Sequence, residues 1–119
     1  MQKWLNSVRY ASKGLIYLVR RERNLQIEIL LAFLSIGFGF WLQISTLEWS
    51  VILLCIGVVI ASEAINTAIE KLSDRITTEQ DVRIGHIKDL AAGGVLIVAF
   101  ISLVIGILIF YPHLAGKFL

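Results

Sequence analysis

Residues 49–74 read WSVILLCIGVVIASEAINTAIEKLSD, so a long apolar run passes without a break into a row of acidic and amide side chains. Glu63, Asn66, Glu70 and Asp74 follow one another at positions i, i+3, i+7 and i+11. At 100° per residue, these four side chains fall within about 80° of one another and form one stripe on a helix. We call this set the acidic stripe. Acids are costly in hydrocarbon, so the pattern predicts a membrane-spanning helix with a functional site where it leaves the bilayer.

The composition is that of a small membrane protein. Of the 119 residues, 57% are hydrophobic and only 17% are charged, and the mean hydropathy is +0.80. Soluble domains average about 25% charged residues. One Pro and nine Gly leave no room for a flexible linker, which predicts a single domain over residues 1–119. The net charge of +2 is too small to indicate a nucleic-acid partner. The single Cys55 cannot form an intrachain disulfide and is expected to be a small residue of the core.

Three apolar segments, residues 25–42, 49–68 and 90–111, are each close to the ~20 residues that a spanning helix needs. Pro112 is expected to end the third segment, because proline disrupts a helix interior. The short link 43–48 makes the first two segments antiparallel neighbours. The sequence therefore predicts an all-α membrane protein with three transmembrane helices.

Basic residues are unevenly distributed between the connecting segments. Six Lys or Arg lie in residues 1–23 and four in 69–89, whereas 43–48 contains none and the tail only Lys117. By the positive-inside rule, the N-terminus and the 69–89 segment face the cytoplasm and the C-terminus lies outside. This orientation places three aromatic residues at the outer interface, where such residues are enriched: Trp41, Trp49 and Tyr111.

Residues 3–20 form a different kind of segment. Its apolar side chains recur at helical spacing on one face, and its basic side chains fall on the opposite face. The apolar set is Trp4, Val8, Ala11, Leu15 and Leu18, and the basic set is Arg9, Lys13 and Arg20. This pattern predicts an amphipathic helix lying on the inner leaflet, the alternative being an ordinary helix with a solvated face.

The acidic stripe divides by depth. Glu63 follows Trp49 by fourteen residues, which places it roughly 21 Å into a hydrocarbon core ~30 Å thick. Glu70 and Asp74 are then expected at the headgroups or in water. A poorly solvated carboxylate suits a general base for a hydroxyl, with Asn66 orienting it, and carboxylates at the wet end can hold Mg²⁺ with substrate phosphates. The alternative is a structural acid at Glu63 followed by an ordinary solvated helix end.

The sequence lacks the motifs of soluble nucleotide-binding proteins, protein kinases and zinc sites. There is no glycine-rich phosphate loop, no protein-kinase motif set and no zinc-ligand spacing. His86 and His113 are expected to be isolated on opposite sides of the membrane. Four glycines within the spans are expected to mark close helix packing: Gly37, Gly39, Gly93 and Gly94.

The acidic stripe and its surroundings resemble the prokaryotic integral-membrane diacylglycerol kinase family, which includes the undecaprenol kinases. The matching blocks are EAINTAIEKLSD at 63–74, IKDLAAGGVLI at 87–97 and ASKG at 11–14, together with Glu22 and Glu28 before the first span. The spacing between the blocks and the three-span plan match as well. The loop departs from the family pattern at Gln80 and Asp81, where members often carry an aromatic residue and a histidine.

The resemblance implies transfer of the γ-phosphate of ATP to a membrane lipid alcohol, with Mg²⁺ as cofactor. Diacylglycerol, converted to phosphatidic acid, is the expected substrate, and undecaprenol is the alternative acceptor. The resemblance also implies a homotrimer with sites shared between protomers, in the bacterial inner membrane. A small non-enzymatic pore or assembly subunit is the alternative from another class.

Residue roles follow from the same resemblance. Glu63 would accept the lipid hydroxyl proton with support from Asn66, and Glu22 and Glu70 would bind the metal. The nucleotide contacts implied by the family are Tyr10, Glu22, Glu70, Asp74, Glu79, Asp81, Lys88 and Asp89. The lipid-substrate contacts implied by the family are Lys3, Ser12, Asn24, Glu28, Trp41, Trp49 and Glu63.

Overall fold

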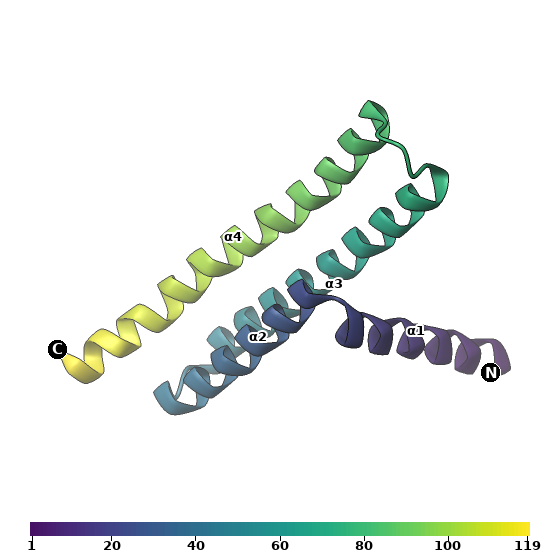
Figure 1. Cartoon of the computed structure of the whole chain (residues 1–119). Helices are drawn as coiled ribbons and strands as arrows, with labels where there is room; N and C mark the ends of the chain where they lie inside the picture. Colours follow the sequence, from purple (N-terminus) through teal and green to yellow (C-terminus); the bar gives the residue numbers. More distant parts are fainter.

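The computed structural model describes residues 1–119 and contains four helices and no strands. The helices are α1 (Gln2–Arg21), α2 (Arg23–Leu42), α3 (Thr46–Ile76) and α4 (Val82–Phe118). Figure 1 shows α3 and α4 as a long hairpin with α2 alongside, while α1 leaves the bundle at a wide angle. The predicted all-α class is confirmed.

Three helices, α2, α3 and α4, are long and apolar enough to cross a membrane, which confirms the three predicted spans. With 31 and 37 residues, α3 and α4 are longer than the apolar segments within them. At 1.5 Å per residue their lengths are about 46 and 56 Å, which exceeds a hydrocarbon core of ~30 Å. The hairpin therefore projects beyond the apolar layer at the end that carries Asp74 and Lys88.

The junction between α1 and α2 is a single residue, Glu22. Its backbone is extended (φ −99°, ψ 113°), and it ends α1 while beginning α2. Arg20 and Arg21 lie in the last turn of α1, where positive charge is favourable, and an acid at the start of α2 is favourable for the same reason. The Nε2 group of Gln26 donates to the carbonyl of Val19 at 2.9 Å, which satisfies part of the exposed end of α1.

The turn from α2 to α3 is held by local hydrogen bonds. Gln43 adopts the left-handed conformation (φ 53°, ψ 54°) that commonly ends a helix. Ser45 and Glu48 then form a capping box: Ser45 Oγ accepts from the Glu48 amide at 3.2 Å, and Glu48 Oε1 accepts from the Ser45 amide at 2.9 Å. This short turn makes α2 and α3 antiparallel neighbours, as predicted.

The prediction that Pro112 ends the third span is wrong, since α4 continues through Pro112 to Phe118. The turn that follows is held by contacts that the sequence does not display. His113 Nε2 lies 3.0 Å from Oε1 and 3.1 Å from Oε2 of Glu48 in α3, and Leu114 packs on the buried cluster near the α2–α3 turn. These contacts offset the one backbone hydrogen bond that proline removes. His113 therefore has an acidic neighbour in Glu48, whereas His86 lies near the opposite end of α4.

The bundle has a small interior. Only 10 of the 119 residues are buried, and α4 contains none of them. The buried apolar side chains include Leu42, Ile44 and Ile52, which form one cluster near the α2–α3 turn with Trp49 against it. Because so much apolar surface is uncovered within one chain, lipid or further protein must cover it.

Gly39 is the one glycine of the four where helices approach closely. A Cβ atom there would lie 2.6 Å from Cη2 and 2.9 Å from Cζ2 of Trp49. The Trp49 ring packs in turn on Phe40, with ring centroids 4.9 Å apart. Gly37, Gly93 and Gly94 have open space at the corresponding position, so close packing at these three is not found within the chain.

Replacing Gly39 by Ala is expected to lower the free energy of unfolding by about 1–3 kcal/mol, because the rigid Trp49 ring must move. Gly37→Ala is the matched control, two residues away in the same helix. It should raise the free energy of unfolding by up to about 1 kcal/mol, because alanine favours the helix and meets no neighbour. Unfolding of both variants by SDS in detergent micelles would measure the difference. Equal effects of the two changes would contradict the packing at Gly39.

Candidate functional site

The acidic stripe lies on one face of α3 and passes from buried to exposed. Glu63 is 4% exposed and Asn66 is 7% exposed, Glu70 is half-buried, and Asp74 is exposed. Two further polar residues of α3, Thr67 and Ser73, are buried on this part of the helix. All the buried polar and charged side chains of the chain are thus on the second half of α3. This is unusual for a membrane helix and marks the region as a site.

Side chains within this region are incompletely paired. Asn66 Nδ2 donates to Glu70 Oε1 at 3.3 Å, which joins two members of the acidic stripe. Three buried oxygens have no hydrogen-bond partner: Asn66 Oδ1, Thr67 Oγ1 and Glu28 Oε2. A buried polar atom without a partner costs roughly 1–3 kcal/mol, so these atoms favour a polar ligand beside α2 and α3.

Acids from other elements surround Glu63. Glu28 of α2 lies within electrostatic range of Glu63, as do Glu70 and the hinge residue Glu22. Carboxylates gathered in this way repel one another, and a cation relieves the repulsion. The structure therefore places the predicted base Glu63 within electrostatic range of the predicted metal ligands Glu22 and Glu70.

The carboxylates of this region suit a hard cation that keeps part of its water shell. No group of three or more acidic, His or Cys side chains is arranged as a complete metal site. Mg²⁺ does not need one, since it keeps several waters and is usually bound by one or two carboxylates plus substrate phosphates. Glu22 and Glu70, both half-buried, supply two such carboxylates.

Two contacts between helices hold the C-terminal end of α3, which projects beyond the apolar layer. Lys71 Nζ donates to Tyr17 Oη of α1 at 2.6 Å, and Lys88 Nζ of α4 pairs with Asp74 Oδ1 at 2.9 Å. Both lysines lie outside the apolar segments 49–68 and 90–111. The hydrogen bond to the Tyr17 hydroxyl raises the pKa of Lys71, and the hydrogen bond that Lys88 donates to Asp74 raises the pKa of Lys88 above its usual range. Both lysines are therefore cations at neutral pH.

The loop between α3 and α4 forms a hollow of about 560 Å³. It contains four of the predicted nucleotide contacts: Asp74, Glu79, Asp81 and Lys88. Asp81 caps α4, its Oδ1 accepting from the Arg83 amide at 2.8 Å and the Ile84 amide at 3.1 Å. The Glu79 amide donates to Thr77 Oγ1 at 3.1 Å. Asp89 is exposed and does not line the hollow.

The remaining predicted contacts are dispersed. Four of them are exposed along α1 and the start of α2: Lys3, Tyr10, Ser12 and Asn24. Trp49 is about 21 Å from Glu63 along α3, and Trp41 lies at the same far end, where its ring is 6.1 Å from that of Phe118. The two tryptophans therefore pack at the end of the bundle opposite the acids.

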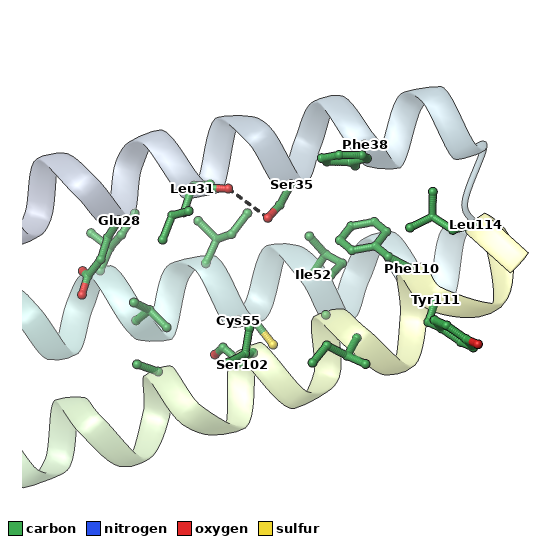
Figure 2. A pocket seen from close by; sticks show the side chains of 18 residues that line it. Glu28, Leu31, Ser35, Phe38, Ile52, Cys55, Ser102, Phe110, Tyr111 and Leu114 are labelled. Atoms are coloured by element: carbon green, nitrogen blue, oxygen red, sulfur yellow. Dashed lines mark hydrogen bonds between the residues drawn. The ribbon is translucent and has the colours of Figure 1, made fainter.

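A cavity of about 550 Å³ runs between α2, α3 and α4 and was not predicted. In Figure 2, Glu28 lies at one end of it, and Phe110, Tyr111 and Leu114 lie at the other. The lining is mostly apolar, and Cys55 faces this space from the middle of α3. The feature of the sequence that could have indicated this cavity is the presence of small side chains inside the spans, where larger residues would fill the space. These side chains are Ser35, Cys55 and Ser102.

These features define a small integral-membrane enzyme with a site where the helices leave the apolar layer. The family model described as prokaryotic diacylglycerol kinase matches residues 9–110, and the chain belongs to this family. It is 38% identical over 114 residues to the undecaprenol kinase of Bacillus subtilis, covering 96% of this chain and 93% of that protein. It is 30% identical over 108 residues to the diacylglycerol kinase of Haemophilus influenzae, covering 90% and 92%.

The predicted resemblance is therefore confirmed, and the chain is a lipid kinase. Its partners are a membrane lipid, ATP and the bilayer itself, and it is a multi-pass membrane protein of bacteria. Membership of this kinase family argues against the alternative of a non-enzymatic pore or assembly subunit.

Proposed function

We propose that the chain transfers the γ-phosphate of ATP to the hydroxyl of a membrane lipid alcohol, with Glu63 as general base. The observation that carries the proposal is the change in burial along the acidic stripe. Glu63 is 4% exposed, whereas Asp74, eleven residues and about 16 Å further along α3, is exposed. One helix face thus joins a position at lipid depth to one that a soluble nucleotide reaches.

The reaction needs a base, a positioned nucleotide and a cation. Glu63 takes the proton from the lipid hydroxyl as its oxygen attacks the γ-phosphorus, and ADP departs with the electrons of the broken P–O bond. Asn66 orients Glu63 and holds Glu70 by the 3.3 Å hydrogen bond. When bound by Glu22 and Glu70, Mg²⁺ neutralises the charge on the phosphate oxygens.

We place the nucleotide over the wet end of α3 and the α3–α4 loop. Lys88 supplies a positive charge for a phosphate, and its pairing with Asp74 at 2.9 Å holds it beside the hollow. Glu79 and Asp81 of the loop, Asp89 of α4 and Tyr10 of α1 complete the proposed nucleotide site. The proposed lipid contacts are Lys3, Ser12, Asn24, Glu28, Trp41 and Trp49, together with Glu63.

Two lipid alcohols are candidates for the acceptor of the phosphate. Diacylglycerol, giving phosphatidic acid, is the acceptor expected from the sequence, and undecaprenol is the second candidate. The identity to an undecaprenol kinase is 38%, against 30% to a diacylglycerol kinase, which favours undecaprenol.

We further propose one domain, assembled as a homotrimer with the N-terminus in the cytoplasm and the C-terminus outside. The small interior supports assembly, because α4 has no buried residue and one chain supplies no complete metal site. The polar and apolar faces of α1 support its placement on the inner leaflet of the bacterial inner membrane.

The change Glu63→Gln keeps the shape of the side chain and removes the base. We expect turnover to fall by at least about 100-fold, because a general base contributes roughly 10²–10⁴. Folding and assembly, followed by size-exclusion chromatography in detergent, should be unchanged. Retained turnover in Glu63→Gln would contradict the role of this carboxylate.

The change Glu70→Gln removes a charged ligand from the proposed metal. The KM for Mg²⁺-ATP is expected to rise by at least about tenfold, while the KM for lipid stays the same. Initial rates over a grid of Mg²⁺ and ATP concentrations measure this. Glu48→Gln, at the opposite end of the bundle beside His113, is the comparison for the loss of one negative charge. Equal responses of the two variants would remove the assignment of Glu70 as a ligand.

The lipid acceptor can be tested directly. Purified protein in mixed micelles, given labelled ATP with either diacylglycerol or undecaprenol, should phosphorylate one with at least about tenfold higher kcat/KM, since the acyl glycerol and the polyprenyl chain differ in shape and length. The Glu63→Gln variant serves as the blank for both. Absence of transfer to any long-chain lipid alcohol would overturn the proposed reaction.

A further inference from the structure

A hydrogen bond between two side chains joins the surface helix α1 to α3. The backbone of α1 packs on α2, and Figure 1 shows α1 extending away from the hairpin. Lys71 of α3 nevertheless reaches Tyr17 of α1, donating from Nζ to Oη at 2.6 Å with the ammonium 4.7 Å from the ring centroid. The two residues are 54 positions apart, so the contact belongs to the tertiary structure alone.

Each member of the pair is close along the chain to one of the two proposed metal ligands. Tyr17 is in the last part of α1, shortly before Glu22, and Lys71 directly follows Glu70. Glu22 sits in the extended hinge between α1 and α2, where a single backbone rotation would move it relative to α3. A contact that holds the end of α1 to α3 therefore also limits the position of Glu22.

The surrounding charges leave Lys71 available for this contact. Asp74, three residues along α3, is paired with Lys88 of α4 at 2.9 Å. Lys71 also lies within electrostatic range of Glu22, so its charge draws the hinge acid toward α3. The hydroxyl of Tyr17 accepts a hydrogen bond from the ammonium, and the ring adds a cation–π contact.

We propose that Tyr17 and Lys71 form a clamp that sets the position of Glu22 relative to Glu70, and thereby the affinity for the metal–nucleotide substrate. Both are positioning residues, because they act through the two carboxylates. The inference rests on the proposed function of Glu22 and Glu70 as metal ligands.

The kinetic test uses variants that remove one part of the clamp each. Tyr17→Phe keeps the ring and removes the hydroxyl, and Lys71→Met keeps the length and removes the charge. Each should raise the KM for Mg²⁺-ATP about three- to tenfold, the range expected for a hydrogen bond to a charged group that is partly exposed. The kcat and the KM for lipid should stay within about twofold, and the double variant should be no worse than the more affected single variant.

Two further variants sharpen the result. Lys71→Arg keeps a charged donor and should restore most of the affinity for Mg²⁺-ATP. Lys117→Met is the matched control, because Lys117 lies 5.1 Å from the ring centroid of Trp41 at the opposite end of the molecule. It removes the same charge and the same kind of aromatic contact, and it should leave the KM for Mg²⁺-ATP unchanged.

A distance measurement provides a readout independent of activity. Nitroxides at Ser7→Cys in α1 and Ile76→Cys in α3, in a Cys55→Ala background, report the position of α1 by pulsed EPR. Both sites are exposed, and excess unlabelled protein suppresses distances between chains. A narrow distance distribution is expected in the parent, and a broader one after Tyr17→Phe.

The outcomes separate the clamp from the proposed function. An EPR distance distribution that Tyr17→Phe leaves unchanged would overturn the clamp. So would clamp variants in which kcat falls and the KM values for Mg²⁺-ATP and for lipid both rise by the same factor. If Glu22→Gln and Glu70→Gln raise the KM for Mg²⁺-ATP while Tyr17→Phe does not, only the clamp fails. If the two Glu→Gln changes also leave it unaltered, the metal-binding role itself fails.

Discussion

The burial of a carboxylate in a membrane helix is the constraint on which the rest of this structure depends. Glu63 is 4% exposed, and lipid cannot solvate it. The helix must therefore turn this face toward other polar groups of the protein. Asn66 and Thr67 lie on the same part of α3, and Glu28 approaches from α2. The rotation of α3 is thus set by polar side chains, and its apolar remainder is left to face lipid and the neighbouring helices.

Polar contacts hold the α3–α4 hairpin at its two ends, and the middle is left loosely filled. Asp74 and Lys88 pair at the wet end, and Glu48 and His113 pair at the other end. Between them lies the cavity of about 550 Å³ between α2, α3 and α4. A fold fixed at its ends can keep open space in the centre, which suits an enzyme whose substrate is a membrane lipid.

The small interior links stability to function. With 10 buried residues and none in α4, one chain has little interior of its own. The acids come from the hinge at Glu22, from α2 and from α3. Contacts between helices, such as that of Tyr17 with Lys71, connect these elements.

The sequence by itself determined the three spans, the acidic stripe and the family, because hydropathy, helical periodicity and motif spacing are local properties of the chain. It also contains the Ser45–Glu48 capping box, whose partners are three residues apart. Only the tertiary structure decided that α4 continues past Pro112, that His113 meets Glu48 and that Lys71 meets Tyr17. Those partners are 65 and 54 residues apart, and their meeting depends on how helices pack, which no local pattern encodes. The cavity has the same origin, since it is the space that three separately specified helices leave between them.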